Sequence, residues 1–426
     1  MSSASPLKFR LFILIAAITF LKGVAILLFL PHPRAWEDSA MAINFMRTGS
    51  LFVSQYGVRN HSFLFPVYPL MIAGLYGIAG SQARLMTLFN VLLSGVTALV
   101  LAGLFPILVS RVDLEARLKG LRRCIVYISV LGFLLHPLIN YYSMNNIHPF
   151  ALYALTFYTL LFLGFRYFER GQKSRDLVLL GVATGANLLT RMTLVVSLVP
   201  FVLLSVADRG WSKALGRTAT VISIGVLLSS PWLIRNYWVD GVVGYTSTTG
   251  EFLWRGSLKN SEGSSYLTDG RTYWTAISDE DSAKLSRMNV ADQDRFFLRE
   301  YLATVTNDPG HVFEMFLVKL RNFFWFRPLI ANGYSTSIQR WVPLYKVVYG
   351  IVLILALLTV PLFGLRSLLV WGPIIGLGVL QSVFYVETRH RVLIEPLLIF
   401  LATLSIAKIV TEAMRDDQSY YRKLWI

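Results

Sequence analysis

The chain has 426 residues, of which 55% are hydrophobic and 15% charged, and its formal net charge is +16. An apolar fraction above half exceeds that of ordinary soluble domains, so the composition excludes a soluble enzyme and indicates a protein that resides in lipid. The positive charge does not indicate nucleic-acid binding, because the basic residues collect in short loops between apolar segments, as they do in membrane proteins.

Long apolar segments recur along the whole chain, and several approach the roughly 20 residues that a helix needs to cross a bilayer. They cover residues 11–30, 85–108, 124–138, 150–165, 177–189, 194–206, 219–234, 344–363, 368–386 and 392–409. We therefore predict an all-α polytopic membrane protein with about ten transmembrane helices, in-plane juxtamembrane helices and one larger external loop.

The distribution of Lys and Arg predicts the orientation of these helices. Basic residues fill the loops at 111–123, 166–175 and 209–217. By the positive-inside rule, these three loops belong in the cytoplasm. Alternate crossings then place both termini in the cytoplasm. The chain divides into an N-terminal membrane module, 1–236, with a first external loop at 31–83, an external region, 237–343, and C-terminal membrane helices with a tail, 344–426.

Two further apolar stretches are predicted to lie along the membrane surface. Residues 63–80 begin with Pro66 and Pro69 and contain several glycines, which weakens a spanning helix. Residues 311–326 carry Glu314, Lys319 and Arg321, and each such charge at the bilayer centre costs roughly 2.5–3.5 kcal/mol. An amphipathic helix in the outer interface fits this second stretch better.

A pair of carboxylates, Glu37 and Asp38, follows the first apolar segment. One interpretation is structural, with Asp38 as the N-cap of a short helix at 39–48 that Gly49 closes. The alternative is catalytic, with one carboxylate at the membrane edge accepting a proton from an acceptor hydroxyl as a general base.

Several basic side chains near the external ends of the predicted helices are candidates for binding a phosphate. Arginine suits this role because its guanidinium group presents a forked set of donors. Loop polarity or anchoring at the membrane interface is the competing explanation. The candidates are Arg59, His61, Arg235, Arg389 and Arg391. The polar cluster at 136–148, which contains His136 and His148, has a spacing that matches no closed metal site, so no metal ligands are predicted there.

Five stretches together resemble the bacterial polyprenyl-phosphate-dependent glycosyltransferases of the GT-C superfamily, and are similar to the dolichyl-phosphate-mannose protein mannosyltransferase family (glycosyltransferase family 39). The stretches are WEDSAMAINFMRTGSLF from Trp36, FPVYPLMIAGLYGIAG from Phe65, PWLIRNYWVDGVVGYTSTTGEFLWRGS from Pro231, DQDRFFLREYLATVTNDPGHVFEMFLVKLRNFFW from Asp292, and ETRHRVLIEPLLIFLA from Glu387. Their order and spacing extend over nearly the whole chain.

The resemblance implies an inverting enzyme of the bacterial inner membrane. It would move a monosaccharide from a polyprenyl-phosphate donor to a glycan, lipid or protein acceptor on the non-cytoplasmic face, with or without a divalent cation. The base maps onto Asp38 or Glu37, and the donor phosphate onto Arg389 and Arg391. Three alternatives remain at this stage: a glycan polymerase or ligase that uses a diphosphate-linked oligosaccharide, a lipid or sugar transporter, and a non-catalytic assembly scaffold.

Overall fold

The computed structural model describes residues 6–30, 33–80, 82–113, 118, 120–327 and 339–424. Helices dominate this part of the chain, as the sequence predicts. The helices of the N-terminal half are α1 (Pro6–Phe29), α2 (Glu37–Thr48), α3 (Val67–Ala79), α4 (Ala83–Val112), α5 (Arg122–Leu134), α6 (Pro137–Met144), α7 (Phe150–Glu169), α8 (Ser174–Thr190), η1 (Met192–Leu198) and α9 (Val199–Asp240).

The C-terminal half begins with short helices and ends with long ones. These are α10 (Thr249–Arg255), η2 (Tyr273–Ala276), α11 (Asp279–Leu285), α12 (Val290–Asn307), α13 (Pro309–Phe324), α15 (Val342–Leu357), α16 (Thr359–Phe363), η4 (Gly364–Ser367), α17 (Leu368–Val383), α18 (Thr388–Val392) and α19 (Glu395–Leu424).

Two very short sheets lie between the helices. Strand β1 (Arg34–Ala35) pairs in parallel with β4 (Asn146–Ile147), and β2 (Val53–Gln55) pairs with β3 (Val58–Asn60) as an antiparallel hairpin. Tyr56 and Gly57 form the hairpin turn and both have positive φ, which matches the right-handed twist of a tight hairpin.

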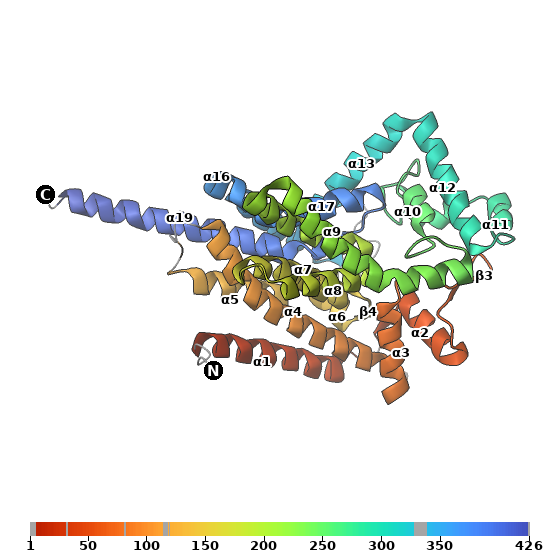
Figure 1. Ribbon diagram of the computed structural model, residues 1–426, viewed down its shortest axis with the longest axis horizontal. Helices are drawn as coiled ribbons and strands as arrows, with labels where there is room; N and C mark the ends of the chain where they lie inside the picture. The colour runs from red at the N-terminus through yellow and green to blue at the C-terminus, as the bar shows by residue number, and fades with distance from the viewer. Residues whose placement is uncertain are drawn as a thin grey trace.

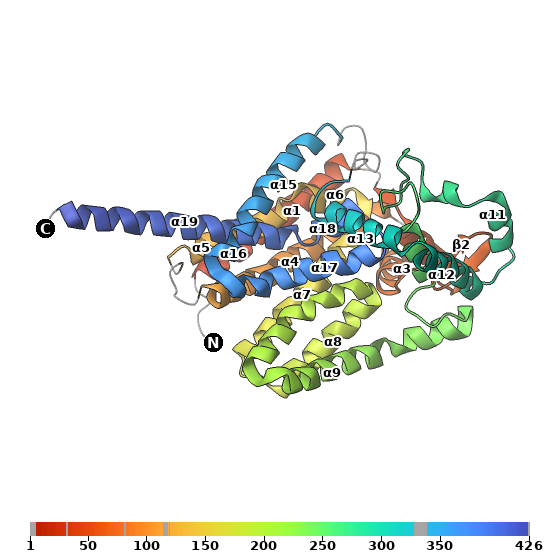
Figure 2. The same ribbon diagram turned by 90° about the horizontal axis from the view of Figure 1, so that it is seen from above.

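By length and composition, six helices of the described residues can cross a membrane, or seven if the bent pair α5 and α6 forms one span. The sequence predicts about ten crossings, and the difference lies mainly in two stretches, 192–240 and 342–383, that are longer than one crossing. The first stretch breaks at Gly210 and the second contains Gly364, and both glycines have positive φ. In Figure 2, α15 and α17 diverge from their junction like the arms of a V.

The two halves of α9 pack on different neighbours, as expected for a helix pair that turns back at Gly210. Val199 and Leu203, before the break, lie against Gly372 of α17. After the break, Ile224 and Leu228 lie against glycines of α8. Close approach at these glycines brings the helix backbones together, which is how membrane helices gain packing energy without a hydrophobic driving force.

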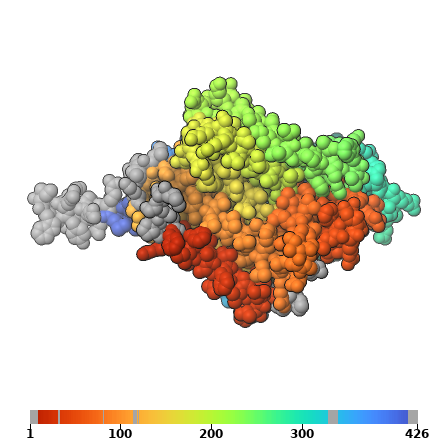
Figure 3. Space-filling model, turned by 60° about the horizontal axis from the view of Figure 1, so that its bottom comes forward, coloured from red at the N-terminus to blue at the C-terminus, as the bar shows by residue number. Residues whose placement is uncertain are grey.

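Helix α1 lies on the outside of the bundle alongside α4 (Figure 3). Phe20, Leu28 and Phe29 of α1 are largely exposed, which is appropriate for a lipid-facing helix. The interior lies around α19, where Phe400 stacks on Phe105 of α4 with ring centroids 4.7 Å apart. Both termini lie at one end of the bundle in Figure 1, whereas α2, α3 and α10–α13 gather at the other end.

The two predicted surface segments are helical. Figure 1 shows α3 running across the direction of α1 and α4, in agreement with an in-plane helix. Helix α13 is amphipathic: Glu314 is exposed, whereas Lys319 is buried and donates to the carbonyl oxygen of Phe384 at 2.8 Å. Arg117, Lys119 and the tail side chains beyond residue 414, which enter the orientation prediction, lie outside the described residues.

Candidate active site

A cavity of about 560 Å³ lies at the end of the bundle opposite the termini. Its walls come from segments far apart in the sequence: the start of α2, the turn before α3, the ends of α6 and α7, the junction of α8 with η1, helix α10 with the loop after it, and the segment from α17 to α18. Charged and aromatic side chains make up most of the lining. The basic and acidic ones are Arg34, Glu37, Asp38, Arg191, Glu251, Arg255, Arg327, Glu387 and Arg389.

The start of α2 is fixed against α6 and α7, and this places the carboxylate pair at the cavity. β1, immediately before α2, pairs with β4, and Nε1 of Trp36 donates to Oδ1 of Asn146 at 3.2 Å. The helix begins at Glu37, with Trp36 in the N-cap position and no side-chain cap. Asp38 is therefore inside the first turn, and the interpretation of Asp38 as an N-cap is wrong. The expected closure at Gly49 is correct, because Gly49 is the left-handed C-cap.

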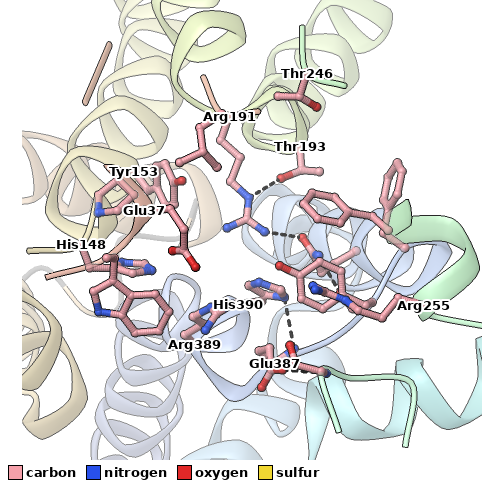
Figure 4. Close-up of a pocket in the computed structure, with 18 of the residues that line it drawn as sticks. Glu37, His148, Tyr153, Arg191, Thr193, Thr246, Arg255, Glu387, Arg389 and His390 are labelled. Carbon is pink, nitrogen blue, oxygen red and sulfur yellow. Dashed lines mark hydrogen bonds between the residues drawn. The ribbon is translucent and has the colours of Figure 1, made fainter. Parts of the chain in front are cut away.

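The two carboxylates have different surroundings. Glu37 is exposed, and in Figure 4 its carboxylate points into the cavity toward Arg191. Asp38 is only 8% exposed, and burial, together with the charge of Glu37, raises the pKa of its carboxyl to about 8. At neutral pH Asp38 is then mostly protonated, whereas Glu37 is open to a substrate.

Arg191 and Arg389 face Glu37 across the cavity (Figure 4). Arg191 is held at the junction of α8 and η1, where Nε donates to Oγ1 of Thr193 at 3.1 Å and Nη2 to Oε1 of Gln381 at 3.0 Å. The guanidinium carbon of Arg389 lies 5.3 Å from the ring centroid of Trp36. Within the described residues, neither arginine lies within 4 Å of a carboxylate oxygen, so both can donate to an anionic ligand.

A third arginine, Arg327, belongs to an ion-pair network in the cavity wall. Nη1 lies 3.3 Å from Oε2 of Glu262, and Nη2 lies 3.5 Å from Oε2 of Glu387. Burial would raise the pKa of Glu387, but the charges of Arg327 and Arg389 outweigh burial and lower it. Glu387 therefore stays ionised, and its contact with Arg327 holds the residue that precedes α18 in place.

Two histidines of the lining, His148 and His390, are neutral. Burial lowers the pKa of each well below its usual range, and the nearby Arg389 and Arg191 lower it further. Each accepts a backbone hydrogen bond at Nδ1, from Phe150 at 3.2 Å and from Glu387 at 3.2 Å. These bonds leave Nε2 as the donor in both rings.

Arg391, predicted to bind phosphate beside Arg389, does not line the cavity. Its guanidinium group is fully buried, where Nε donates to Oε1 of Glu395 at 2.9 Å and Nη1 to the carbonyl oxygen of Trp325 at 2.8 Å. It also lies 4.0 Å from the ring centroid of Tyr349. Residues two apart on a helical turn point in different directions, so α18 directs Arg389 to the cavity and Arg391 into the core.

The remaining predicted phosphate ligands also lie outside the cavity. Nη1 of Arg235 donates to the carbonyl oxygen of His61 at 2.8 Å, and Nδ1 of His61 lies 3.0 Å from Oδ1 of Asp240. Arg59 is exposed, with its guanidinium carbon 5.1 Å from the ring centroid of Phe52. Arg235 and His61 thus attach the first external loop to the end of α9.

Sequence reasoning missed four lining arginines: Arg34, Arg191, Arg255 and Arg327. A signal existed for Arg191, which is the lone charge between the apolar segments 177–189 and 194–206, at a predicted external turn. No such signal marks Arg255 or Arg327, because both come from the long external region and reach the cavity through tertiary packing. Among the described residues, no group of three or more His, Cys, Asp or Glu could hold a metal ion.

The fold and the cavity define a polytopic helical membrane protein with a charged, arginine-rich cavity at one end of its bundle. No protein-family model and no curated protein matches the chain. Its structure is similar to ArnT from Cupriavidus metallidurans bound to undecaprenyl phosphate, with 13% identity, a TM-score of 0.40, and coverage of 93% of this chain and 77% of that one. Apo ArnT from the same organism gives 14% identity, a TM-score of 0.37, and coverage of 93% and 76%.

Proposed function

We propose that the protein is an inverting glycosyltransferase that moves a monosaccharide from a polyprenyl-phosphate donor to a hydroxyl group of a cell-envelope glycan, lipid or protein. The observation that carries the proposal is the juxtaposition in one cavity of an accessible carboxylate, Glu37, with Arg191 and Arg389, neither of which has a carboxylate oxygen within 4 Å among the described residues. A membrane-embedded bundle with such a cavity suits a donor that is an anionic lipid.

The chemistry follows from this arrangement. The acceptor oxygen attacks the anomeric carbon while its proton passes to Glu37 as general base. The bond from the anomeric carbon to the phosphate oxygen breaks on the opposite face, and its electron pair stays on the phosphate, whose negative charge increases. Arg191 and Arg389 stabilise that charge, and such electrostatic stabilisation of the transition state is usually the largest single contribution to catalysis. One displacement inverts the anomeric configuration.

Asp38 has a different part in this scheme. With a pKa of about 8 it is mainly a neutral acid at pH 7, and it can donate a hydrogen bond beside Glu37 without competing for the arginines. We therefore assign the base to Glu37 and leave Asp38 as a neutral neighbour.

The apolar part of the lining fits the beginning of a lipid tail. Phe63, Leu64 and Phe65 line the cavity directly before the in-plane helix α3, and Met192 lines it at the start of η1. The basic loops and both termini lie at the other end of the bundle. By the positive-inside rule the cavity then opens at the non-cytoplasmic face of the membrane. The resemblance to bacterial enzymes leads us to propose that this is a bacterial inner membrane.

The proposal is tested by incubating the purified full-length protein with radiolabelled polyprenyl-phosphate monosaccharides and membrane acceptors. We expect transfer from at least one such donor, release of polyprenyl phosphate, and an inverted anomeric configuration in the product. Transfer only from a diphosphate-linked oligosaccharide would favour the polymerase or ligase alternative. Movement of intact donor across proteoliposomes without cleavage would favour a transporter.

A further inference from the structure

Arg255, the last residue of α10, reaches the cavity although only 6% of the residue is exposed. Its guanidinium carbon lies 3.4 Å from the ring centroid of Tyr385 and 4.4 Å from that of Tyr273. At 3.4 Å only face-on stacking fits on Tyr385. The N–H groups, which lie in the guanidinium plane, therefore point past the edge of the ring and remain available as donors.

The protein supplies few acceptors for these donors. No described residue accepts a hydrogen bond from Arg255, and because its Nε is enclosed, the two Nη groups are the donors that can reach the cavity. The charges of Glu251 and Glu387 act on Arg255, but neither carboxylate lies within 4 Å of its guanidinium group. Glu251 accepts from Nε2 of Gln55 at 2.6 Å and from the hydroxyl of Tyr273 at 2.7 Å, and Glu387 pairs with Arg327. A buried cation with free donors facing a cavity is a built site for an anion.

Two glycines explain how the sequence holds Arg255 in place. A Cβ atom at Gly256 would overlap the carbonyl oxygen of Phe384, and a Cβ atom at Gly250 would overlap the carbonyl oxygen of Asp294. Helix α10 is thus pressed against the end of α17 and against α12, and this contact stacks Arg255 on Tyr385. Arg327 lies in the same wall but is not free to bind a ligand, because its Nη groups pair with Glu262 and Glu387 and its Nε is enclosed.

We propose that Arg255 forms a second anion-binding subsite, which takes a carboxylate or phosphate group carried by the transferred sugar or by the acceptor. Figure 4 places Arg255 on the side of the cavity opposite Glu37, whereas Arg191 and Arg389 lie nearer to that carboxylate. Because the donor phosphate is assigned to Arg191 and Arg389, this subsite is available for a different anionic group. The assignment of that group to a substrate rests on the proposed function; the anion subsite does not.

The subsite is tested by measuring the thermal unfolding midpoint of the purified full-length protein. The midpoint in D-glucuronate is compared with that in D-glucose at constant ionic strength. Glucuronate, and not glucose, should raise the midpoint of the wild type. Arg255→Met should weaken the apparent affinity for glucuronate at least tenfold, and Arg255→Lys should weaken it less. Arg299→Met, which removes an exposed charge of α12, should behave as the wild type. No stabilisation of the wild type, or equal stabilisation of Arg255→Met, would overturn the subsite.

The source of the anion is identified by transfer assays with matched pairs: polyprenyl-phosphate glucuronic acid against polyprenyl-phosphate glucose, and an anionic lipid acceptor against its neutral analogue. A loss of kcat/KM of at least tenfold in Arg255→Met that appears only with the acidic donor assigns the group to the sugar. A loss that appears only with the anionic acceptor assigns it to the acceptor. An equal effect on all pairs would overturn the proposal. Absence of transfer by the wild type refutes the proposed function, while glucuronate binding still decides the subsite.

Discussion

The buried ion pair between Arg391 of α18 and Glu395, the first residue of α19, should be essential for stability. Glu395 is 3% exposed and accepts from Nε of Arg391 at 2.9 Å, from the hydroxyl of Tyr345 at 2.6 Å, and from Nε2 of His136 at 2.7 Å. Glu395→Ala leaves Arg391 charged and fully buried, with only neutral acceptors remaining among the described residues: the carbonyl oxygen of Trp325 at 2.8 Å and the hydroxyl of Tyr345 at 3.4 Å. Removing one partner of a buried pair costs about 3–5 kcal/mol, which is the loss we expect in the free energy of unfolding.

Helix α11 provides a matched control. Lys284 and Glu280 form an ion pair with the same four-residue spacing, but their side chains are 51% and 79% exposed. Glu280→Ala should therefore cost less than about 1 kcal/mol. Denaturant unfolding in detergent compares the two variants at equal protein concentration. Equal and small losses in both would refute the reasoning that burial makes the Glu395 pair indispensable.

Three further predictions concern the cavity. Gly256→Ala should lower the free energy of unfolding by about 1–3 kcal/mol, because the new Cβ atom would overlap the carbonyl oxygen of Phe384. Gly216→Ala, whose Cβ atom would meet open space, should stabilise α9 by roughly 0.5–1 kcal/mol. Equal effects of the two substitutions would contradict the close approach of α10 to Phe384. The pKa of Asp38 is about 8 in the folded protein and 3.8 for an ordinary carboxyl, so ionisation of Asp38 destabilises the fold as the pH rises between these values. The free energy of unfolding of Asp38→Asn should therefore increase relative to the wild type from pH 4 to pH 8, and the difference should be constant above pH 8. A difference that does not depend on pH would contradict the burial of Asp38. Arg389→Met should raise the KM for a polyprenyl-phosphate donor about tenfold or more, through loss of charge-assisted hydrogen bonds, and an unchanged KM would remove Arg389 from the phosphate site.

The sequence predicts the membrane architecture well because hydropathy and the distribution of basic residues are local properties. The all-helical class, the in-plane segment before α4 and the second span at 85–108 all follow from residue composition. The division of helices at Gly210 and Gly364 depends on backbone conformation, which composition indicates only weakly.

The site is less predictable, because its residues meet only through tertiary packing. Glu37, Asp38 and Arg389 could be named from their places beside apolar segments, and they do line one cavity. Arg391 could not be separated from Arg389 by sequence, because the direction of each side chain depends on the short helix α18. Arg255 reaches the cavity only because Gly250 and Gly256 let α10 pack closely, which a sequence pattern does not reveal.

The central claim, that Glu37 accepts the acceptor proton on the side opposite the departing donor phosphate, is tested most directly by comparing transfer at pH 7 by Glu37→Gln and Asp38→Asn at matched levels of folded protein. The account predicts that Glu37→Gln lowers the rate about 10²–10⁴-fold, the usual contribution of a general base. It predicts that Asp38→Asn stays within a few-fold of the wild type, because Asp38 is already mostly neutral at that pH. Wild-type transfer by Glu37→Gln would contradict the account.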